Sequence, residues 1–366
     1  MIHLKQLSTQ QLLCLVLLTQ VGVHVLSIPF HESRHAGYDA WMSILLGGII
    51  AQAVILIIYW LGKRYADQSL PQYMTSLLGK PVGVVMNVLL AVYCAESSLL
   101  VAVSYTDVIE RWLLITTPWY VILGLSFAIA AYIASSSLRS LAVVTQAIMF
   151  MFLISVAIVL VSGLGHGDYR HLLPIGTHGL GTIIRDSLPA LWLYAGYELL
   201  LYVFPSIKYR KQRDIIIAMS VANGLATLFY VLISLVVMYK FSESQLNSIA
   251  EPLVYILRQF YWPVVQSLDI LFMTIWLSVI SVTVYMYLFL SARYLAFVSR
   301  REIRKHSLLV WIIAGICFLV GLLGEDRERV LKFTVYHNYA TGIIVVILPI
   351  LLLLVSLVRE KGGFAK

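Results

Sequence analysis

The sequence predicts an all-α, polytopic membrane protein, and its composition carries that prediction. Hydrophobic residues make up 60% of the 366-residue chain and charged residues only 12%, whereas soluble domains contain about 25% charged residues. The apolar residues gather in segments of about 20, the length at which a helix crosses a bilayer. The order of long, short and interrupted segments further predicts ten transmembrane helices in a five-plus-five inverted repeat, an arrangement found in many transporters.

Ten apolar segments are predicted as transmembrane helices. The third and eighth are longer than one crossing requires, the fourth and ninth are short, and the first and sixth are interrupted, so the pattern recurs after five segments. We expect a single membrane domain over residues 1–366, with one repeat over about 8–163 and the other over about 183–358. The segments are Gln11–Phe30, Trp41–Leu61, Gly83–Leu114, Tyr120–Ala134, Leu141–Gly163, Ile183–Phe204, Ile215–Tyr239, Val264–Leu295, Leu308–Leu323 and Tyr336–Val358.

The placement of basic residues predicts the orientation in the membrane. With the amino terminus inside, most of the 26 Lys and Arg residues fall on the inner side, including the clusters Lys208–Arg213 and Arg300–Lys305. Cytoplasmic loops carry an excess of Lys and Arg. Both termini are therefore expected in the cytoplasm, and the +8 net charge indicates membrane topology and the lipid bilayer as partner, with no nucleic acid.

The first and sixth segments carry the signs of broken helices. The first contains Gly22 and His24 at mid-membrane depth, and the sixth contains Pro189, Gly196 and Glu198. Glycine weakens a helix, and unwound backbone at that depth is tolerated only where it is buried in protein or lines a cavity. Two interrupted spans in matching positions of two halves point to a transporter-type binding site.

Two groups of residues resemble metal-binding patterns but are not expected to bind a metal. Cys14, Cys94 and Cys317 each lie in an apolar segment without a CxxC spacing, which favours buried hydrophobic packing. The His31–His35 segment matches the H-E-x-x-H pattern of zinc hydrolases. Because Gly37 follows it and no third ligand is evident, a polar connector is the preferred interpretation, and no metal or cofactor is expected.

Polar residues inside the predicted spans are the candidates for chemistry. A buried carboxylate such as Glu96 or Glu198 should face the bundle interior, paired or protonated, either as a proton site or as a brace for a broken helix; for Glu198 we favour the brace. Spacing places Tyr93, Ser97 and Leu100 on the helical face of Glu96. Thr283 and Tyr287, one turn apart on the eighth segment, favour the same cavity, although packing or interhelical hydrogen bonds would also explain them.

The sequence resembles a family, the B subunits of spore nutrient-germinant receptors. This family lies within the amino acid–polyamine–organocation permease superfamily. The resemblance rests on Leu26–Pro29, Ala36–Trp41, Leu188–Pro189, Gly196–Glu198 and Pro205. It implies the inverted-repeat transporter fold and a germinant, an amino acid or similar small molecule, held between helices 1, 3, 6 and 8. It also implies a complex with an A subunit and a lipoprotein C subunit in the inner membrane of a bacterial spore.

The same resemblance implies roles for individual residues. Val21–His24 matches the unwound Gly-x-Gly segment whose backbone N–H groups receive a carboxylate, with Gly22 and Val23 at the ligand. His24 replaces the second glycine, which either narrows the pocket or adds a hydrogen-bonding imidazole. Trp192 matches an aromatic residue over the substrate, Leu193 an apolar wall, and Gly196 the break in the sixth helix.

Three functions remain open from the sequence. The preferred one is a germinant-sensing membrane subunit that binds its ligand and signals through its partners, without enzymatic activity. A proton- or ion-coupled amino-acid permease needs the same site plus an ion or proton site, which Glu96 could supply. A membrane zinc protease, which depends on His31, Glu32 and His35 alone, is the remote alternative.

Overall fold

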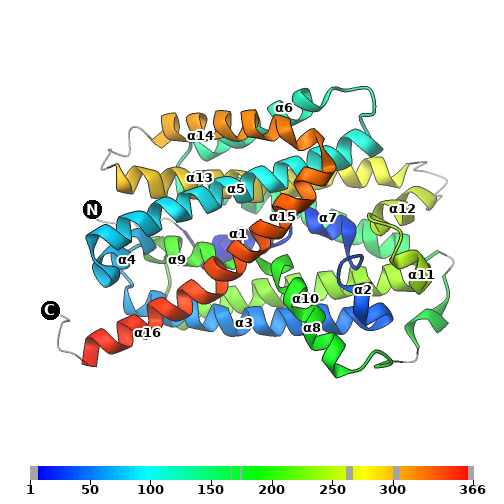
Figure 1. Ribbon diagram of the computed structural model, residues 1–366, viewed down its shortest axis with the longest axis horizontal. Coiled ribbons are helices and arrows are strands. Elements are labelled where there is room, and N and C mark those ends of the chain that lie inside the picture. The colour runs from blue at the N-terminus through cyan, green and yellow to red at the C-terminus, as the bar shows by residue number, and fades with distance from the viewer. Residues whose placement is uncertain (1–6, 166, 174, 261–266, 300–305, 362–366) are drawn as a thin grey trace.

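The chain is a bundle of long helices that run side by side (Figure 1). The computed structural model describes residues 7–165, 167–173, 175–260, 267–299 and 306–361. In the first half the elements at predicted spans are α1 (Thr9–Gln20), η1 (Val23–Ser27), α3 (Ala40–Arg64), α5 (Lys80–Trp112), α6 (Trp119–Ala134) and α7 (Leu138–Gly163).

The second half follows the same order. Its elements are α8 (Leu180–Leu191), η4 (Trp192–Tyr194), η5 (Tyr197–Leu199), α9 (Leu200–Val203), η6 (Phe204–Ser206), α10 (Arg213–Lys240), α13 (Leu268–Val298), α14 (His306–Gly321), η8 (Leu322–Glu325), α15 (Arg327–Thr341), the π-helical turn η9 (Gly342–Ile347) and α16 (Leu348–Lys361). Short elements in the connections are α2 (Ser33–Ala36), η2 (Gly37–Asp39), α4 (Leu70–Leu78), η3 (Tyr169–Leu172), α11 (Glu243–Leu246) and α12 (Pro252–Gln259).

The predicted pattern of long, short and broken spans is confirmed. Helices α5 and α13 have 33 and 31 residues, whereas α6 and α14 have 16 each. The sixth span bends by 52° between its two halves. Within the described residues, seven helices are long and apolar enough to cross a membrane, or eight if the bent pair is one span. Since α1 has only 12 residues and α6 is also short, the count of ten stays a prediction.

The connection between α10 and α13 contains two short helices, α11 and α12, because Pro252 lacks an N–H and tolerates only the first turn of a helix. One predicted boundary is wrong. The tenth span, expected from Tyr336, already begins at Arg327, since the charged residues before it continue the helix. Residues 264–266 of the eighth predicted span and the basic cluster at 300–305 lie outside the described residues.

Helix α1 lies at the centre of the bundle, where it contacts α7, α10 and α13. Its start is fixed by a capping box, in which the Ser8 hydroxyl accepts the Gln11 N–H and the Gln11 side chain accepts the Ser8 N–H. Leu12 and Leu15–Leu18 are fully buried, as expected for a helix that is apolar on all sides. The free cysteines Cys14, Cys94 and Cys317 are buried as predicted.

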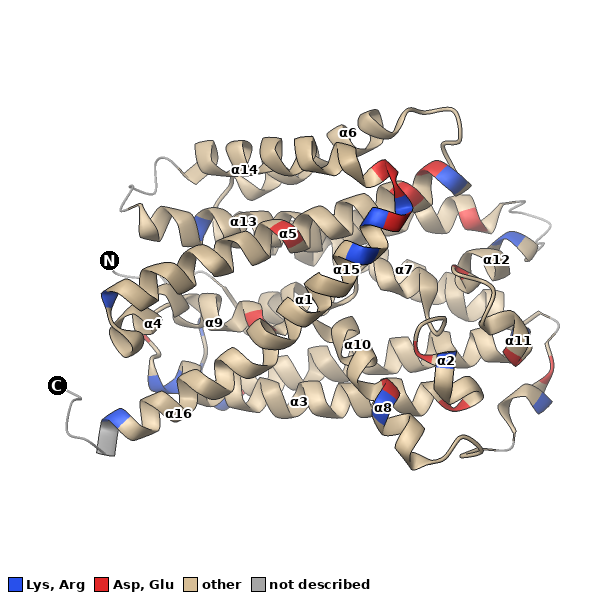
Figure 2. Cartoon of the chain, in the orientation of Figure 1, with Lys and Arg blue, Asp and Glu red and all other residues tan. Residues whose placement is uncertain are grey.

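Main-chain hydrogen bonds join the start of α1 to the end of the sixth span. The Leu7 N–H donates to the Ser206 carbonyl at 3.0 Å, and the Lys208 N–H donates to the Leu7 carbonyl at 2.7 Å, which forms an isolated parallel bridge between Leu7 and Ile207. The start of α1 and the end of α16 lie at one end of the bundle (Figure 1). Charged residues gather towards the two ends of the helices, with few between them (Figure 2).

Candidate functional site

The breaks in the first and sixth spans touch each other at the centre of the bundle. Helix α1 ends at Gln20, and η1 resumes after the extended residue Gly22. In the sixth span, Gly196 separates the two halves with φ +128°. A Cβ atom on Gly196 would lie 2.9 Å from the Gln20 nitrogen and from the Thr19 carbonyl carbon. The backbones of the two spans are therefore in contact, with no room for a side chain between them.

A cavity of about 70 Å³ lies beside these breaks. Nine of the ten residues predicted to bind a ligand line it: Gly22, Val23, His24, Tyr93, Ser97, Trp192, Leu193, Thr283 and Tyr287. The tenth, Gly196, does not line it, and Ala195 takes its place. The segments predicted as helices 1, 3, 6 and 8 thus meet around one space, while ligand binding by these residues stays a prediction.

Glu198 does not line the cavity but is buried with two short hydrogen bonds. Its Oε2 accepts the Gly196 N–H at 2.6 Å, and its Oε1 accepts the Tyr287 hydroxyl at 2.6 Å. Hydrogen bonds to a charged acceptor are stronger than neutral ones. The carboxylate thus ties the break of the sixth span to α13, which is the geometry of a brace.

Glu96 departs from the expected position. Its helical neighbours Tyr93, Ser97 and Leu100 line the cavity, whereas Glu96 itself does not. Its Oε1 lies 3.4 Å from Nδ1 of His337 on α15. The expectation that Glu96 borders the cavity together with these residues is wrong, because its side chain pairs with His337 of the tenth span and does not line the cavity.

The tenth span contributes four lining residues that were not predicted. Thr334, His337, Asn338 and Thr341 face the cavity from α15. The His337 ring stacks on Tyr93 with 5.4 Å between centroids, and the Tyr93 hydroxyl donates to Thr341. The sequence did contain a signal, since these polar residues recur at positions i, i+3, i+4 and i+7, which lie on one helical face.

Comparison with known proteins identifies the family. Residues 6–330 match the family model described as "Spore germination protein". The chain belongs to this family.

Relatives from Bacillus cereus and Bacillus subtilis match most of the chain at low identity. Spore germination protein GerQB of Bacillus cereus is 24% identical over 278 residues, which cover 74% of each chain. Spore germination protein B2 of Bacillus subtilis (strain 168) is 21% identical over 366 residues, covering 98% of this chain and 97% of that protein. These relatives are named as germination proteins, not as enzymes.

The fold is that of a solved structure outside these relatives. The crystal structure of MhsT in complex with L-phenylalanine superposes with a TM-score of 0.68 and covers 93% of this chain and 87% of that one, at 14% identity. At this identity the likeness shows the fold alone. The family and the fold together make this chain an integral membrane protein with broken first and sixth helices.

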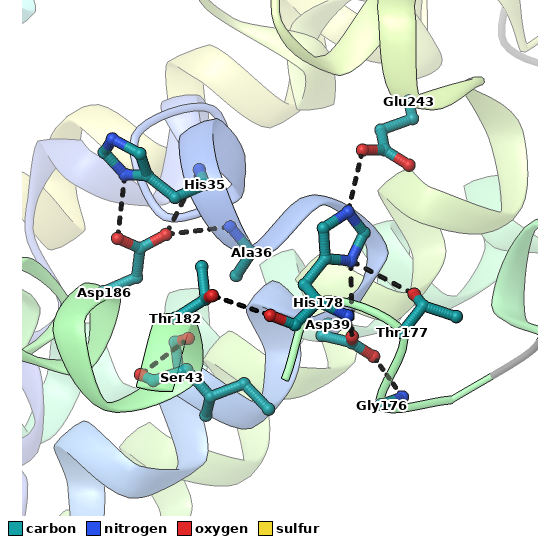
Figure 3. Close-up of polar contacts among 11 residues, drawn as sticks. His35, Ala36, Asp39, Ser43, Gly176, Thr177, His178, Thr182, Asp186 and Glu243 are labelled. Carbon is teal, nitrogen blue, oxygen red and sulfur yellow. Dashed lines mark hydrogen bonds and ion pairs between the residues drawn. The ribbon is translucent and has the colours of Figure 1, made fainter. Parts of the chain in front are cut away.

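At one end of the bundle, three acidic residues hold the connectors of this family member together (Figure 3). Asp39 accepts the N–H groups of Gly176 and His178 at 2.7 and 3.0 Å. The His178 ring lies between Asp39 and Glu243, 3.3 and 3.2 Å from their carboxylate oxygens. Asp186 on α8 accepts the N–H groups of residues 35 and 36. The first half of the sixth span, α8, is thereby fixed to the connector after the first span.

The H-E-x-x-H segment lies within this network. The His35 ring lies 3.0 Å from Asp186, and only Ser33–Ala36 is α-helical, since Gly37 follows with φ +50°. Glu32 is buried, and burial raises its pKa to about 7, against weaker hydrogen bonds that lower it. Within the part of the chain that the structure describes, no group of three or more His, Cys, Asp or Glu side chains is arranged to hold a metal ion.

Proposed function

We propose that this chain is the ligand-binding membrane subunit of a spore germinant receptor, and that its ligand is an amino acid or similar small molecule. One observation carries the proposal: nine residues from four spans, chosen from the sequence as ligand contacts, line one cavity at the paired helix breaks. Membership in the spore germination family supports the signalling role. The proposal includes an A subunit and a lipoprotein C subunit as partners, in the inner membrane of the spore with both termini in the cytoplasm.

The proposed ligand lies with its carboxylate near the backbone of Gly22 and Val23. Trp192 and Leu193 form an apolar side of the site, while Ser97 and Thr283 offer hydroxyl groups. A buried water needs about 10–15 Å³ of such space, so the cavity has room for about five to seven non-hydrogen atoms. A small amino acid fits that size. Closure around it is the event that the partner subunits would detect.

Gly22 gives a direct test, because a side chain there has open space in the folded protein. A Cβ atom on Gly22 meets no heavy atom within 4 Å, and its φ of −104° suits any residue. Gly22→Val should therefore fold and yet occupy part of the cavity. Overpacking against a ligand costs about 1–3 kcal/mol, which corresponds to a roughly five- to hundredfold higher germinant concentration. Gly22→Ala should have a smaller effect in the same direction.

The measurement is a dose–response curve of germination in spores that carry each variant, with the abundance of the chain and of its partners measured in parallel. Gly224→Val is the matched control, because Gly224 is also surrounded by open space but lies on the exposed side of α10, away from the cavity. A wild-type response of Gly22→Val spores at normal protein abundance would show that the ligand binds elsewhere in the receptor.

A coupled amino-acid permease is the second candidate, and the Glu96–His337 pair favours it. Glu96 is the middle residue of α5 (Lys80–Trp112), and an ionisable pair at mid-membrane depth beside a cavity is a common feature of proton pathways. Uptake of labelled amino acids into proteoliposomes under a proton gradient distinguishes the two functions. Uptake that Glu96→Gln abolishes would establish transport, whereas binding without uptake would support the sensor.

A further inference from the structure

The face of α15 that lines the cavity is polar along its whole length. Thr334, His337, Asn338 and Thr341 form it, whereas Leu331, Phe333, Val335, Tyr336 and Tyr339 on the other sides of the helix are exposed. Polar side chains within a membrane span are costly unless they have partners or face a cavity. The inward polar face of α15 therefore gives the cavity a polar side, while the apolar Trp192 and Leu193 line another part of it.

Three of the four polar residues on this face already have partners. Thr334 donates to the carbonyl of Val330, and Thr341 donates to the carbonyl of His337. His337 is positioned by Tyr93, Glu96 and Ser97, although its ring nitrogens lie 3.4 and 3.5 Å from the Glu96 and Ser97 oxygens. Such distances are at the limit of a hydrogen bond.

Asn338 differs from these neighbours. Its carboxamide makes no hydrogen bond to any of the residues that the structure describes, and it is only partly exposed. A carboxamide offers two donor hydrogens and one acceptor oxygen. In a confined space, donor and acceptor groups without a hydrogen-bond partner destabilise the folded protein, and a ligand that bonds to them removes this cost.

His24 is the second such residue. It lines the same cavity from η1. The His24 ring also makes no hydrogen bond within the described part of the chain, while its carbonyl accepts the Ser27 hydroxyl. An imidazole and a carboxamide, both without partners, thus border the polar side of one small cavity.

The geometry points to Asn338 and His24 as the residues that select the side chain of the ligand: this site takes a small amino acid with a hydroxyl group. The inference rests on the proposed function, because it assumes that the ligand binds in this cavity. A polar side-chain end would meet Asn338 and His24, while the apolar part of the ligand packs on Trp192 and Leu193. A site with hydrogen-bonding groups rejects an analogue that lacks the matching group, because those groups are then left without partners.

Pairs of amino acids of similar shape test this inference on the purified full-length protein in lipid nanodiscs. The probes are L-serine with L-alanine, L-serine with L-2-aminobutyrate, and L-threonine with L-valine. The half-saturating concentration of each is read from the shift in thermal unfolding. We expect the polar member of at least one pair to bind about tenfold more tightly or better, the discrimination that one buried hydrogen bond supplies.

Asn338→Leu is the decisive variant, because leucine keeps the approximate shape and removes the hydrogen-bonding groups. It should abolish most of the preference by weakening the polar member. Asn338→Ala serves if the leucine variant does not fold. Tyr339→Phe is the matched control, since it removes a polar group from the same helix at a side chain that is 68% exposed; its preference should equal that of the wild type.

The outcomes separate this inference from the proposed function. If Gly22→Val abolishes binding and both Asn338 variants keep the wild-type preference, the cavity is the site and the inference about selectivity is wrong. If Gly22→Val leaves binding unchanged, the proposed site itself is wrong. An equal or reversed preference in all three pairs, or no binding of any probe, overturns the inference as well.

Discussion

Gly196 offers the sharpest test of the contact between the two broken spans. Its φ of +128° lies in the region that favours glycine. In Gly196→Ala the new methyl group would lie 2.9 Å from the Gln20 nitrogen and the Thr19 carbonyl carbon, and 3.0 Å from the Thr19 carbonyl oxygen. All three are main-chain atoms of α1, which cannot rotate away as a side chain could. The substitution should therefore destabilise the fold, beyond any effect on a ligand.

Two contributions set the expected magnitude. A non-glycine residue in a sparsely populated backbone region costs about 1–3 kcal/mol, and overpacking adds about 1–3 kcal/mol. The free energy of unfolding should fall by about 2–6 kcal/mol when both apply in full. With about 2–4 °C per kcal/mol for a large chain, the midpoint of thermal unfolding should fall by about 5–20 °C.

Thermal unfolding of the purified protein in detergent, followed by size-exclusion chromatography, measures this loss. The matched control is Gly22→Ala at the other break, where a Cβ atom meets nothing within 4 Å and φ is −104°. Its stability should equal the wild-type value or rise by up to about 1 kcal/mol, because alanine restricts the unfolded chain. Equal midpoints for Gly196→Ala and the wild-type protein would refute the close backbone contact.

The remaining predictions concern the buried carboxylates and the orientation. Glu198→Gln replaces one accepting oxygen by a donor and should lower the free energy of unfolding by about 1.5–3 kcal/mol. Tyr287→Phe should lower it by less, and the double variant should lose less than the sum of the two single losses. Additive losses would contradict the Glu198–Tyr287 contact. Because the pKa of Glu32 is raised to about 7 from 4.5, folded protein holds this proton longer than unfolded protein does, so stability should fall as pH rises from about 4.5 to 7. Glu32→Gln should remove that slope and add about 3 kcal/mol above pH 7; an unchanged slope in thermal unfolding would assign it to another group. In a cysteine-free background, Arg34→Cys and Arg210→Cys, both at exposed positions, should react with an impermeant thiol reagent from opposite faces, and labelling from the same face would reverse the topology.

Much of the fold could be predicted because a bilayer makes hydropathy informative. Every backbone polar group inside lipid must be satisfied within a helix, so span lengths could be read from apolar segments. The breaks were evident because Gly22 and Gly196 interrupt such segments. Of the nine lining residues, Gly22, Val23, His24, Trp192 and Leu193 were predicted from the family resemblance. The other four were predicted from helical spacing: Tyr93, Ser97, Thr283 and Tyr287.

The tenth span shows why the rest could not be predicted. Charged residues from Arg327 to Lys332 precede His337 and Asn338, and they indicate a loop when hydropathy alone is considered. The structure continues α15 through them, which brings the polar face of that helix to the cavity. The direction of Glu96 depended on the same missing neighbour. Likewise, the contacts of His178 with Asp39 and Glu243 join three connectors that no spacing in the sequence relates.

The bridge between Leu7 and Ile207 joins the first and sixth spans through main-chain atoms alone. Its two hydrogen bonds run between the N–H and carbonyl groups of Leu7, Ser206 and Lys208, so no side chain takes part. Alanine scanning of this region would not detect the bridge, because each alanine variant keeps the backbone N–H and carbonyl groups that form it. The first and sixth spans can separate at this end only when these backbone hydrogen bonds break. Lys208→Pro would remove one of them, because proline lacks the N–H that donates to the Leu7 carbonyl.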